Sequence, residues 1–403
     1  MQYRIDKKSG NKLSILGFGC MRFPRNIAGT DTRKTEELIM RSIEGGVNYF
    51  DTAWVYPGSE ETLGTILDNN QARGNIFLAT KMPLIMLRSP ADFDKYFLHS
   101  LKRLKTDYID YYLLHMITDM DQWAKLKSWG IEQWIADKKR AGQIRQIGFS
   151  YHGSSTEFLK VIDDYDWEVS QIQYNYSDEN FQAGVTGLRK AAQTMTVMVM
   201  EPLLGGKLAT GLPKEAVDIF KKANPELSPA GWGLNWVWDQ EEVTLLTSGM
   251  STMAQLEENL RLADTAYAKK HGEQETDIYR QALALINRNI KIQCTGCNYC
   301  MPCPKNVNIP GCLSAYNTMY SMGYVTGLRQ FISSTGLISE QSGSPGLCTN
   351  CGLCETRCPQ QLPIIKHLKQ AHRRLEPFLV QFMGVCARAF MGRKRKKNAV
   401  QKN

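Results

Sequence analysis

The order of apolar and amphipathic segments over the first two thirds of the chain restricts its fold more than any other feature. Up to about residue 270, short apolar runs alternate with amphipathic, helix-like segments. Little polar alternation occurs within the runs, which is typical of strands buried on both faces of a parallel sheet. Eight such units in about 250 residues predict an α/β fold with a closed (β/α)8 barrel, the TIM barrel. The apolar runs are residues 13–21, 47–53, 75–81, 108–115, 143–150, 168–175, 196–203 and 243–250.

A doubly wound open sheet is the alternative arrangement for this alternation. That fold holds a dinucleotide with a glycine-rich turn after its first strand. The corresponding segment here, residues 17–22, reads Gly-Phe-Gly-Cys-Met-Arg and lacks the third glycine of the G-x-G-x-x-G motif. The barrel is therefore the favoured prediction.

The remaining third of the chain has a different composition. Residues 271–293 are predicted to form a helical connector. Residues 294–375 concentrate cysteine, proline and glycine on either side of a helical stretch, and residues 376–403 combine an apolar segment with a basic end. We therefore expect four parts: a barrel at 1–270, the connector, a mostly α-helical domain at 294–375 and a tail at 376–403.

Two cysteine runs dominate the predicted helical domain. Ten of the eleven cysteines follow residue 290. Their spacings of two or three residues indicate metal or cluster ligation in a reducing compartment, whereas secreted proteins distribute disulfides through a small fold. The second run, Cys348-x2-Cys351-x2-Cys354-x3-Cys358-Pro, has the spacing of bacterial ferredoxin-type [4Fe–4S] ligation. The first run has the same order, but its last gap is two residues, as in Cys294-x2-Cys297-x2-Cys300-x2-Cys303-Pro.

Eight thiols in two quartets predict two [4Fe–4S] clusters in a ferredoxin-like domain, although a zinc site would need only four cysteines in two pairs. Two divisions of the ligands remain open. Either each run holds its own cluster, or the first three cysteines of each run share a cluster with the last cysteine of the other. The predicted ligands are Cys294, Cys297, Cys300, Cys303, Cys348, Cys351, Cys354 and Cys358.

Polar side chains stand where several predicted strands end. Asp51 follows the second strand, Lys81 ends the third, His115 ends the fourth, and Tyr56 lies in the loop after Asp51. Barrel enzymes place their active sites at these carboxyl ends. Hydride addition to a carbonyl leaves an alkoxide that needs a proton, and a tyrosine can supply it. We expect Lys81 to lower the tyrosine pKa from about 10, Asp51 to hold the lysine, and His115 to orient the substrate oxygen.

The motifs around these residues resemble those of the aldo/keto reductase family over residues 1 to about 268. The resemblance implies a catalytic tetrad of Asp51, Tyr56, Lys81 and His115, and reduction of an aldehyde or ketone with NADPH or NADH at the barrel mouth. The motifs, in the family's order, are FDTAWVY (50–56), GSEETLG (58–64), LATK (78–81), YLLH (112–115), IGFS (147–150), QIQYN (171–175) and GMSTMAQLEENL (249–260).

The same resemblance implies a set of cofactor contacts. Two residues would contact the nicotinamide carboxamide, the turn at 200–208 the diphosphate and ribose, and the segment at 249–259 the adenosine side. In that order, the contacts are Ser150, Gln171, Glu201, Pro202, Leu203, Gly205, Lys207, Gly249, Ser251, Gln255, Glu258 and Asn259.

Three positions depart from the family pattern. Tyr151 follows Ser150 where many members have asparagine, and Glu201 or a neighbour replaces the aromatic residue that stacks on the nicotinamide in many members. No lysine or arginine lies within residues 249–255 to pair with the 2′-phosphate of NADPH. The choice between NADPH and NADH therefore stays open.

The formal charge of +9 is concentrated at the C-terminus. Residues 387–403 hold seven lysines and arginines and no acidic residue, which leaves +2 for the rest of the chain. A nucleic-acid partner needs cations spread over a folded surface, so none is expected. The apolar segment before the basic run suits a weak membrane-surface contact. The polar N-terminus, the absence of long apolar runs and the cysteine spacing together predict a cytoplasmic protein.

Two functional hypotheses follow from the combination of parts. A nicotinamide transfers a two-electron hydride, whereas a cluster accepts one electron at a time; a flavin usually mediates, and the sequence shows no flavin signature. In the first hypothesis, the barrel reduces a small-molecule carbonyl and the clusters are structural or regulatory. In the second, the clusters couple the barrel to a redox partner, through a flavin or a partner protein. A further alternative is an electron-transfer subunit or scaffold in which the barrel is secondary.

Overall fold

The chain divides into two compact units in the computed structural model. The barrel unit comprises Met1–Thr210 and Asn224–Asp277, and the cysteine-rich unit comprises Gly211–Ala223 and the chain from Ile278 onward. The structure describes residues 1–26, 29–153, 155–288, 290–294, 296, 300–321, 323–335, 343–358, 362–377 and 380.

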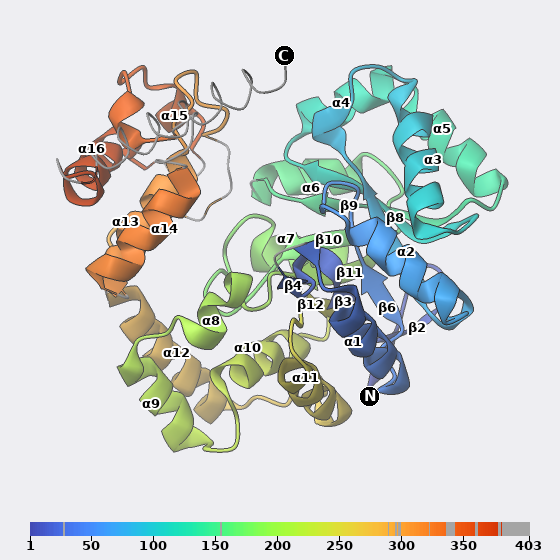
Figure 1. Ribbon diagram of the computed structural model, residues 1–403, viewed down its shortest axis with the longest axis horizontal. Helices are drawn as coiled ribbons and strands as arrows, with labels where there is room; N and C mark the ends of the chain where they lie inside the picture. The colour runs from blue at the N-terminus through green and yellow to red at the C-terminus, as the bar shows by residue number, and fades with distance from the viewer. Residues whose placement is uncertain are drawn as a thin grey trace, which may run out of the picture. The chain divides into compact units, whose positions relative to one another are not determined.

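Eight parallel strands close a barrel in the first unit (Figure 1), which confirms the (β/α)8 prediction. Neighbouring strands follow chain order, and the last pairs with the first, with Leu246 opposite Leu16. Each strand lies within or overlaps one of the eight predicted apolar runs. The strands are β3 (Leu16–Gly19), β6 (Tyr49–Asp51), β7 (Phe77–Met82), β8 (Ile109–Ile117), β9 (Ile144–Tyr151), β10 (Val169–Gln173), β11 (Thr196–Met200) and β12 (Leu245–Ser248).

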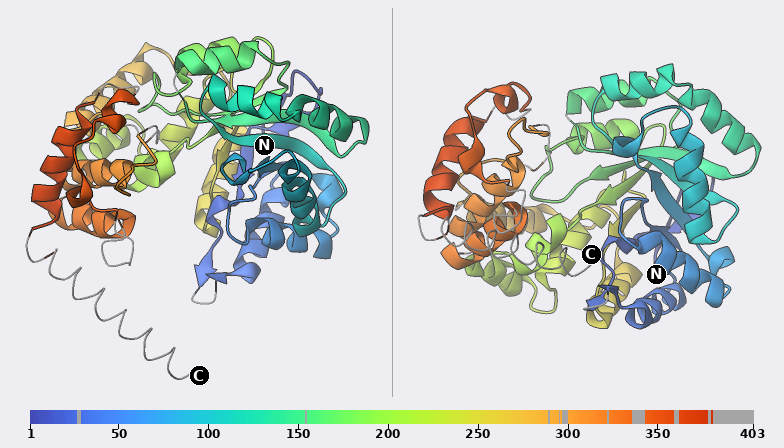
Figure 2. Two further views of the ribbon diagram at one scale, coloured as in Figure 1. Left: turned by 90° about the horizontal axis from the view of Figure 1, so that it is seen from above. Right: turned by 45° about the horizontal axis from the view of Figure 1, so that its top comes forward.

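Helices surround the strands (Figure 2) because both faces of each strand are apolar and need cover. In β8, for example, Tyr111 and Leu113 belong to one buried cluster, while Tyr112 and Leu114 belong to the larger cluster shared with the helices. The helices are α1 (Thr32–Glu44), α2 (Ser59–Asn69), α3 (Asp92–Leu104), α4 (Met120–Ser128), α5 (Ile131–Arg140), α6 (Ser155–Asp163), α7 (Gly184–Ala191), α8 (Lys207–Thr210), α10 (Pro229–Trp238) and α11 (Met253–Thr265).

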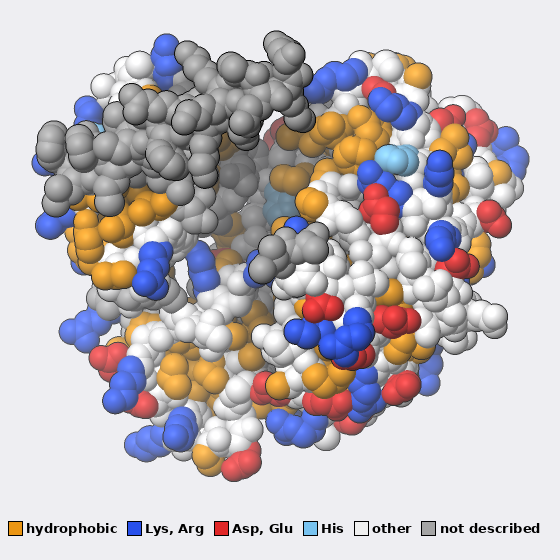
Figure 3. Space-filling model, in the orientation of Figure 1, with side chains coloured by type: hydrophobic (Ala, Val, Ile, Leu, Met, Phe, Trp, Pro, Cys, Tyr) orange, Lys and Arg blue, Asp and Glu red, His pale blue; other side chains and the backbone are white. Residues whose placement is uncertain are grey.

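Short elements complete the barrel unit. An antiparallel hairpin of β1 (Tyr3–Ile5) and β2 (Lys12–Ser14) precedes the first barrel strand. After that strand, β4 (Arg25–Asn26) pairs with β5 (Gly29–Thr30). On the visible face, acidic and basic side chains are interspersed (Figure 3). One exposed ion pair of this unit joins Arg41 and Glu257 at 2.6 Å. Exposed pairs of this kind contribute little stability each.

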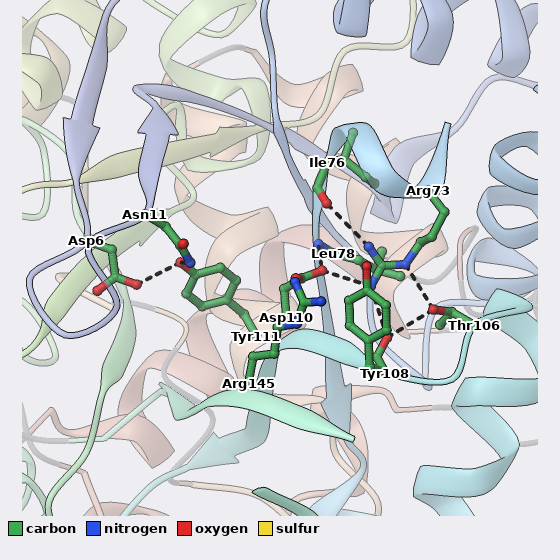
Figure 4. Close-up of polar contacts among 10 residues, drawn as sticks. All are labelled: Asp6, Asn11, Arg73, Ile76, Leu78, Thr106, Tyr108, Asp110, Tyr111 and Arg145. Atoms are coloured by element: carbon green, nitrogen blue, oxygen red, sulfur yellow. Dashed lines mark hydrogen bonds and ion pairs between the residues drawn. The ribbon is translucent and has the colours of Figure 1, made fainter. Parts of the chain in front are cut away.

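The turn of the N-terminal hairpin buries Asp6 at the amino ends of the strands (Figure 4). Its carboxylate accepts hydrogen bonds from Tyr111 Oη at 2.7 Å, Thr196 Oγ1 at 2.6 Å, Ser9 Oγ at 2.6 Å and the Lys8 amide at 2.9 Å. Burial alone would raise the pKa of Asp6, but these donors outweigh it and lower the pKa. The ionised carboxylate thereby ties the hairpin to β8 and β11.

An Asp6→Asn variant is expected to lose about 1–3 kcal/mol of unfolding free energy at pH 7, because an amide cannot accept all these hydrogen bonds. A lowered native pKa stabilises the fold fully above the unfolded value of about 3.9 and loses that contribution as the pH falls further. The difference from the parent should therefore narrow below about pH 4 in urea titrations. Exposed Asp166 supplies the control, since Asp166→Asn removes only a surface ion pair with Lys8. Equal urea midpoints for Asp6→Asn and the parent protein at pH 7 would contradict this account.

A second buried carboxylate anchors the start of β8 (Figure 4). Asp110 accepts from Arg73 Nη2 at 2.8 Å, Arg145 Nη1 at 2.9 Å and the Leu78 amide at 3.0 Å. The two guanidinium groups also lie 4.1 and 3.9 Å from the centre of the Tyr108 ring. These contacts fix β7 beside β8 at their amino ends. The carboxyl ends of the same two strands carry candidate site residues.

The cysteine-rich unit is mostly α-helical, as predicted. The chain passes from one unit to the other within α12 (Glu273–Arg288), inside the predicted connector 271–293. Its core joins side chains of α13 and α16, among them Leu313 and Leu368. No helix in the described part of the chain is long and apolar enough to cross a membrane. The other helices of this unit are α9 (Lys214–Ala223), α13 (Ile309–Ser321), α14 (Tyr324–Thr335), α15 (Leu353–Thr356) and α16 (Ile364–Leu375).

The predicted boundaries after residues 270, 293 and 375 stay predictions. Most of the predicted tail 376–403, including its entire basic run, lies outside the described residues.

Candidate active site and cysteine site

A buried ion pair forms the floor of the candidate active site. Asp51 is the last residue of β6, and Lys81 lies near the end of β7, so both side chains stand at the carboxyl edge of the barrel. Lys81 Nζ donates to Asp51 Oδ2 at 2.6 Å and to the Thr52 carbonyl at 2.8 Å. The lysine side chain is only 1% exposed. Its position and charge are therefore fixed by protein groups rather than by water.

Two aromatic side chains lie beside this pair. Tyr56 follows β6, and Lys81 Nζ lies 5.4 Å from the centre of its ring. The ring of His115, from β8, meets the Tyr56 ring edge-on with 5.9 Å between ring centres. The structure thus brings together the four residues that the sequence places in a tetrad.

The protonation states differ in one respect from the sequence expectation. Burial raises the pKa of Tyr56 above its ordinary value; the Lys81 charge lowers this pKa, as expected, but does not outweigh burial, so the net direction is upward. Burial alone would lower the pKa of Lys81, but Asp51 and Tyr56 raise it above its ordinary value. Burial and the Lys81 charge hold the pKa of His115 well below its ordinary value. At neutral pH the site therefore holds a protonated phenol, an ammonium ion and a neutral imidazole.

A β-bulge follows His115. Met116 has a left-handed φ of 66°, and the β8–β9 register is irregular between Leu114 and Ile117. The Met116 amide donates to Ser150 Oγ at 2.8 Å, which secures the bulge. Bulges re-aim neighbouring side chains, and this one sits directly after the candidate histidine. Because a hydroxyl both accepts and donates, Ser150 keeps its own proton for another partner.

Gln171 lies opposite Ser150 in the pairing of β10 with β9. Its Nε2 donates to Asp51 Oδ1 at 3.2 Å, while its buried Oε1 has no hydrogen-bond partner among the described residues. A hydroxyl donor beside an unpartnered amide oxygen matches the acceptor and donor of a carboxamide. Tyr151, where many family members have asparagine, does not join them, because its buried ring belongs to the core outside the strands and its hydroxyl donates to the Thr118 carbonyl.

A cleft of about 430 Å³ opens between the loops after β11 and β12, and we call it the β11–β12 cleft. Its walls are mostly backbone, small side chains and amides, which suits close approach of an extended ligand. Nine of the predicted cofactor residues line it; Ser150, Gln171 and Lys207 do not. The nine are Glu201, Pro202, Leu203, Gly205, Gly249, Ser251, Gln255, Glu258 and Asn259.

Local hydrogen bonds shape both loops of the cleft. Glu201 has a left-handed φ of 54°, and its carbonyl accepts from Asn175 Nδ2 at 3.2 Å. On the other side, Gln255 Oε1 accepts from the Ser251 amide at 2.8 Å, and Asn259 Nδ2 donates to Ser248 Oγ at 3.2 Å. The residues present therefore form a preshaped polar cleft at the carboxyl edge of the barrel, the edge at which the tetrad residues also lie, and this cleft fits a dinucleotide.

Sequence reasoning missed Arg22, which also lines the β11–β12 cleft. It ends the short 3-10 helix η1 (Cys20–Arg22) that directly follows β3. Its place after a barrel strand, at the edge where Asp51 and Lys81 lie, is the signal that could have identified it.

A second site lies in the cysteine-rich unit. Five cysteines line one small cavity, which we call the cysteine cavity: Cys300, Cys303, Cys348, Cys351 and Cys354. The set combines members of both runs, and its apolar walls include Ile309 and Leu368. Several thiols around an apolar cavity are the donor set that iron–sulfur clusters use.

The other cysteines have different surroundings. Cys294 and Cys358 are partly buried against the same core, and the predicted ligand Cys297 lies outside the described residues. Cys312 is buried in that core, with its Sγ 3.6 Å from the Gly343 carbonyl oxygen. Within the ranges described, no three histidine, cysteine or acidic side chains converge as they would on one metal ion.

Comparisons with known proteins identify a family for each of the two parts of the chain. Residues 15–279 match the model of the Aldo/keto reductase family, and residues 293–363 match that of the 4Fe-4S dicluster domain. An uncharacterized oxidoreductase, YqkF, from Bacillus subtilis strain 168 is 28% identical over 291 residues, or 62% of this chain and 88% of the relative. An L-glyceraldehyde 3-phosphate reductase from Escherichia coli O157:H7 is 25% identical over 313 residues, or 65% and 87%.

Among solved structures, the aldo-keto reductase AKR11C1 from Bacillus halodurans (holo form) shares the fold. It is 24% identical, with a TM-score of 0.56, over 70% of this chain and 96% of that one. The family match covers well over half of the sequence and includes all eight barrel strands. The chain therefore belongs to the aldo/keto reductase family, as an oxidoreductase that carries a 4Fe-4S dicluster domain after its barrel.

Proposed function

We propose that the protein reduces an aldehyde or ketone at the expense of NADPH or NADH, with Tyr56 as the general acid. The observation that carries this proposal is the packing of Tyr56 against Lys81 and His115, above a buried ion pair and in a barrel whose mouth also holds the β11–β12 cleft. When bound, the reduced nicotinamide supplies a hydride to the carbonyl carbon.

Tyr56 moves the proton in this proposal. Because its pKa is raised, the hydroxyl stays protonated at neutral pH and can donate to the carbonyl oxygen as negative charge develops there. Lys81, held by Asp51 and the Thr52 carbonyl, keeps its positive charge close to the phenol. That charge stabilises the phenolate left behind, and its fixed position removes the cost of reorganising solvent.

His115 orients the substrate. A neutral imidazole carries one N–H donor and one acceptor, so the ring can donate to the substrate oxygen beside Tyr56. The bulge at Met116 follows directly after this residue in β8. A cationic imidazole would be a second acid beside Tyr56, and the lowered pKa of His115 leaves Tyr56 as the proton donor.

Cofactor binding is assigned to two groups of residues. Ser150 and Gln171 would hold the nicotinamide carboxamide through a hydroxyl proton and the unpartnered Oε1. The lining of the β11–β12 cleft would hold the rest of the dinucleotide, whereas Lys207 stays a prediction, because it is outside that lining. The substrate is a small carbonyl compound, the class named by the reductase relatives.

The cysteine-rich unit is proposed to bind two [4Fe–4S] clusters through the eight predicted cysteines. Cys303 lines the cysteine cavity with three members of the second run and Cys358 does not, which supports the crossed division of ligands, although Cys300 of the first run lines the cavity as well. When bound, the clusters supply one-electron chemistry. Exposed Cys351 at this cavity favours access by a redox partner protein, the second candidate role. We place the protein in the cytoplasm on the strength of its many closely spaced thiols; the proposed membrane contact concerns tail residues outside the described ones.

Isotope transfer tests the proposal. Anaerobically purified protein is incubated with NADPH or NADH that carries two deuterium atoms at C4 and with a panel of aldehydes and ketones, and the alcohols are analysed by mass spectrometry. We expect one deuterium on the carbinol carbon of the product. The proposed reaction would be contradicted if no carbonyl compound led to oxidation of NADPH or NADH. It would also be contradicted if the deuterium were found at any other position of the product.

A further inference from the structure

Arg22 crosses from the first strand of the barrel to the loop after β11. Its Nη1 donates to the Gly205 carbonyl at 2.9 Å, and its Nη2 lies 3.9 Å from Glu201 Oε1. The Arg22 carbonyl accepts from Ser251 Oγ at 2.9 Å. Arg22 is therefore attached to both loops of the β11–β12 cleft, through its backbone on one side and its guanidinium on the other.

Two glycines lie against this side chain. A Cβ placed on Gly249 would lie 3.5–3.7 Å from the Cβ, Cγ and Cδ atoms of Arg22, so the arginine stem packs beside a position that has no side chain of its own. A Cβ on Gly205 would lie 3.1 Å from Arg22 Nη2. Gly205 also has a left-handed φ of 66°, which other residues rarely adopt. The guanidinium position thus depends on residues of both loops.

The residues that line the cleft carry little positive charge with which to bind a phosphate group. Among the residues that line it, Arg22 is the single lysine or arginine, and Glu201 and Glu258 are acidic. A nicotinamide dinucleotide carries a diphosphate, and NADPH carries a further 2′-phosphate. An anion of this kind is held poorly without a cation, and a guanidinium is the best-matched partner for it.

The guanidinium of Arg22 has N–H donors available to bind a phosphate group. The guanidinium has five N–H donors, and the hydrogen bond to Gly205 occupies one of them. Glu201 lies beyond hydrogen-bond distance, close enough to attract the charge without consuming a donor. The side chain is 49% exposed, so a ligand in the cleft can reach it.

We propose that Arg22 is a phosphate ligand of the β11–β12 cleft and supplies, from η1 after the first barrel strand, the cation that residues 249–255 lack. The inference rests on the proposed function, because the phosphate belongs to the nicotinamide dinucleotide. Glu201 and the Gly205 carbonyl act as positioning groups that keep the guanidinium over the cleft before the nucleotide arrives.

Binding constants of the full-length protein test this role without any turnover. The dissociation constants of NADPH, NADH and the fragment 2′,5′-ADP are measured by calorimetry for the parent, Arg22→Met and Arg22→Lys. We expect Arg22→Met to weaken NADPH binding roughly 10- to 100-fold, the usual effect of losing a charged hydrogen-bond partner. Arg22→Lys should recover part of the loss, because lysine keeps the positive charge but lacks the paired N–H donors of the planar guanidinium.

The pattern of losses identifies the phosphate. A loss confined to NADPH and 2′,5′-ADP assigns Arg22 to the 2′-phosphate, and an equal loss for NADPH and NADH assigns it to the diphosphate; both support the proposal. The control is Arg33→Met, which removes an exposed cation of α1 outside the cleft and should change no constant. Circular dichroism and cluster absorbance establish that each variant is folded.

Two failures are distinguishable in this experiment. If the parent binds both dinucleotides and Arg22→Met binds them equally well, the role of Arg22 is overturned while the proposed function stands. If the parent binds neither, the proposed function itself fails.

Discussion

A Tyr56→Phe variant is expected to bind NADPH or NADH as tightly as the parent and to reduce carbonyl substrates about 10²- to 10⁴-fold more slowly, the usual worth of a positioned general acid. The substitution removes one hydroxyl. It leaves the ring that packs beside Lys81 and His115, so the packing around the buried Asp51–Lys81 ion pair stays the same. The loss should therefore appear in kcat and leave the nucleotide dissociation constant unchanged.

The measurement is single-turnover and steady-state reduction of one aldehyde at saturating nucleotide. Tyr267→Phe, at an exposed tyrosine, is the matched control and should retain full turnover. Unchanged turnover in Tyr56→Phe would reject Tyr56 as the proton donor.

The pH profile of the parent adds an independent check. Burial raises the pKa of Tyr56, so its hydroxyl is protonated at every pH below the ordinary tyrosine value of about 10. We expect the rate of the chemical step to be constant between pH 6 and 9 and to fall only at higher pH. A fall that begins near neutrality would mean that the lysine dominates over burial, contrary to the environment described here.

The barrel and the positions of its tetrad were predictable because both depend on local pattern. Apolar runs without alternation specify strands buried on two faces, and parallel strands in a barrel place their carboxyl ends at one edge. Asp51, Lys81 and His115 therefore had to lie near one another once the strands were identified. The direction of the Tyr56 pKa could not be predicted, because the cost of desolvating a phenolate depends on burial that sequence order does not reveal.

Arg22 illustrates a second kind of failure. The family resemblance predicts a phosphate-binding cation within residues 249–255, next to the other predicted contacts in the sequence. Barrel closure brings β3 against β12 so closely that a Cβ on Gly19 would lie 3.3 Å from the backbone of Ser248. A cation from the first strand thereby lies beside Gly249. Only the pairing of first and last strands, which sequence distance conceals, makes these residues neighbours.

The division of the cluster ligands was left open by spacing, because both divisions satisfy it. The cysteine cavity favours the crossed division, in which Cys303 joins Cys348, Cys351 and Cys354. Paired substitutions turn this into a count of iron atoms. The double variant Cys303→Ala/Cys351→Ala removes two ligands of one cluster under the crossed division, and one ligand of each cluster if every run holds its own.

Iron and acid-labile sulfide per chain, measured after anaerobic purification, should fall from about eight of each in the parent to about four in Cys303→Ala/Cys351→Ala. The reciprocal variant Cys294→Ala/Cys303→Ala should fall further, because the crossed division takes its two ligands from different clusters. Cys312→Ala is the control and should keep the full content, since Cys312 is a core residue close to the Gly343 carbonyl. The opposite order of the two double variants would establish that each run holds its own cluster. An iron-free parent, or a parent with one tetrahedral zinc, would remove the cluster proposal altogether.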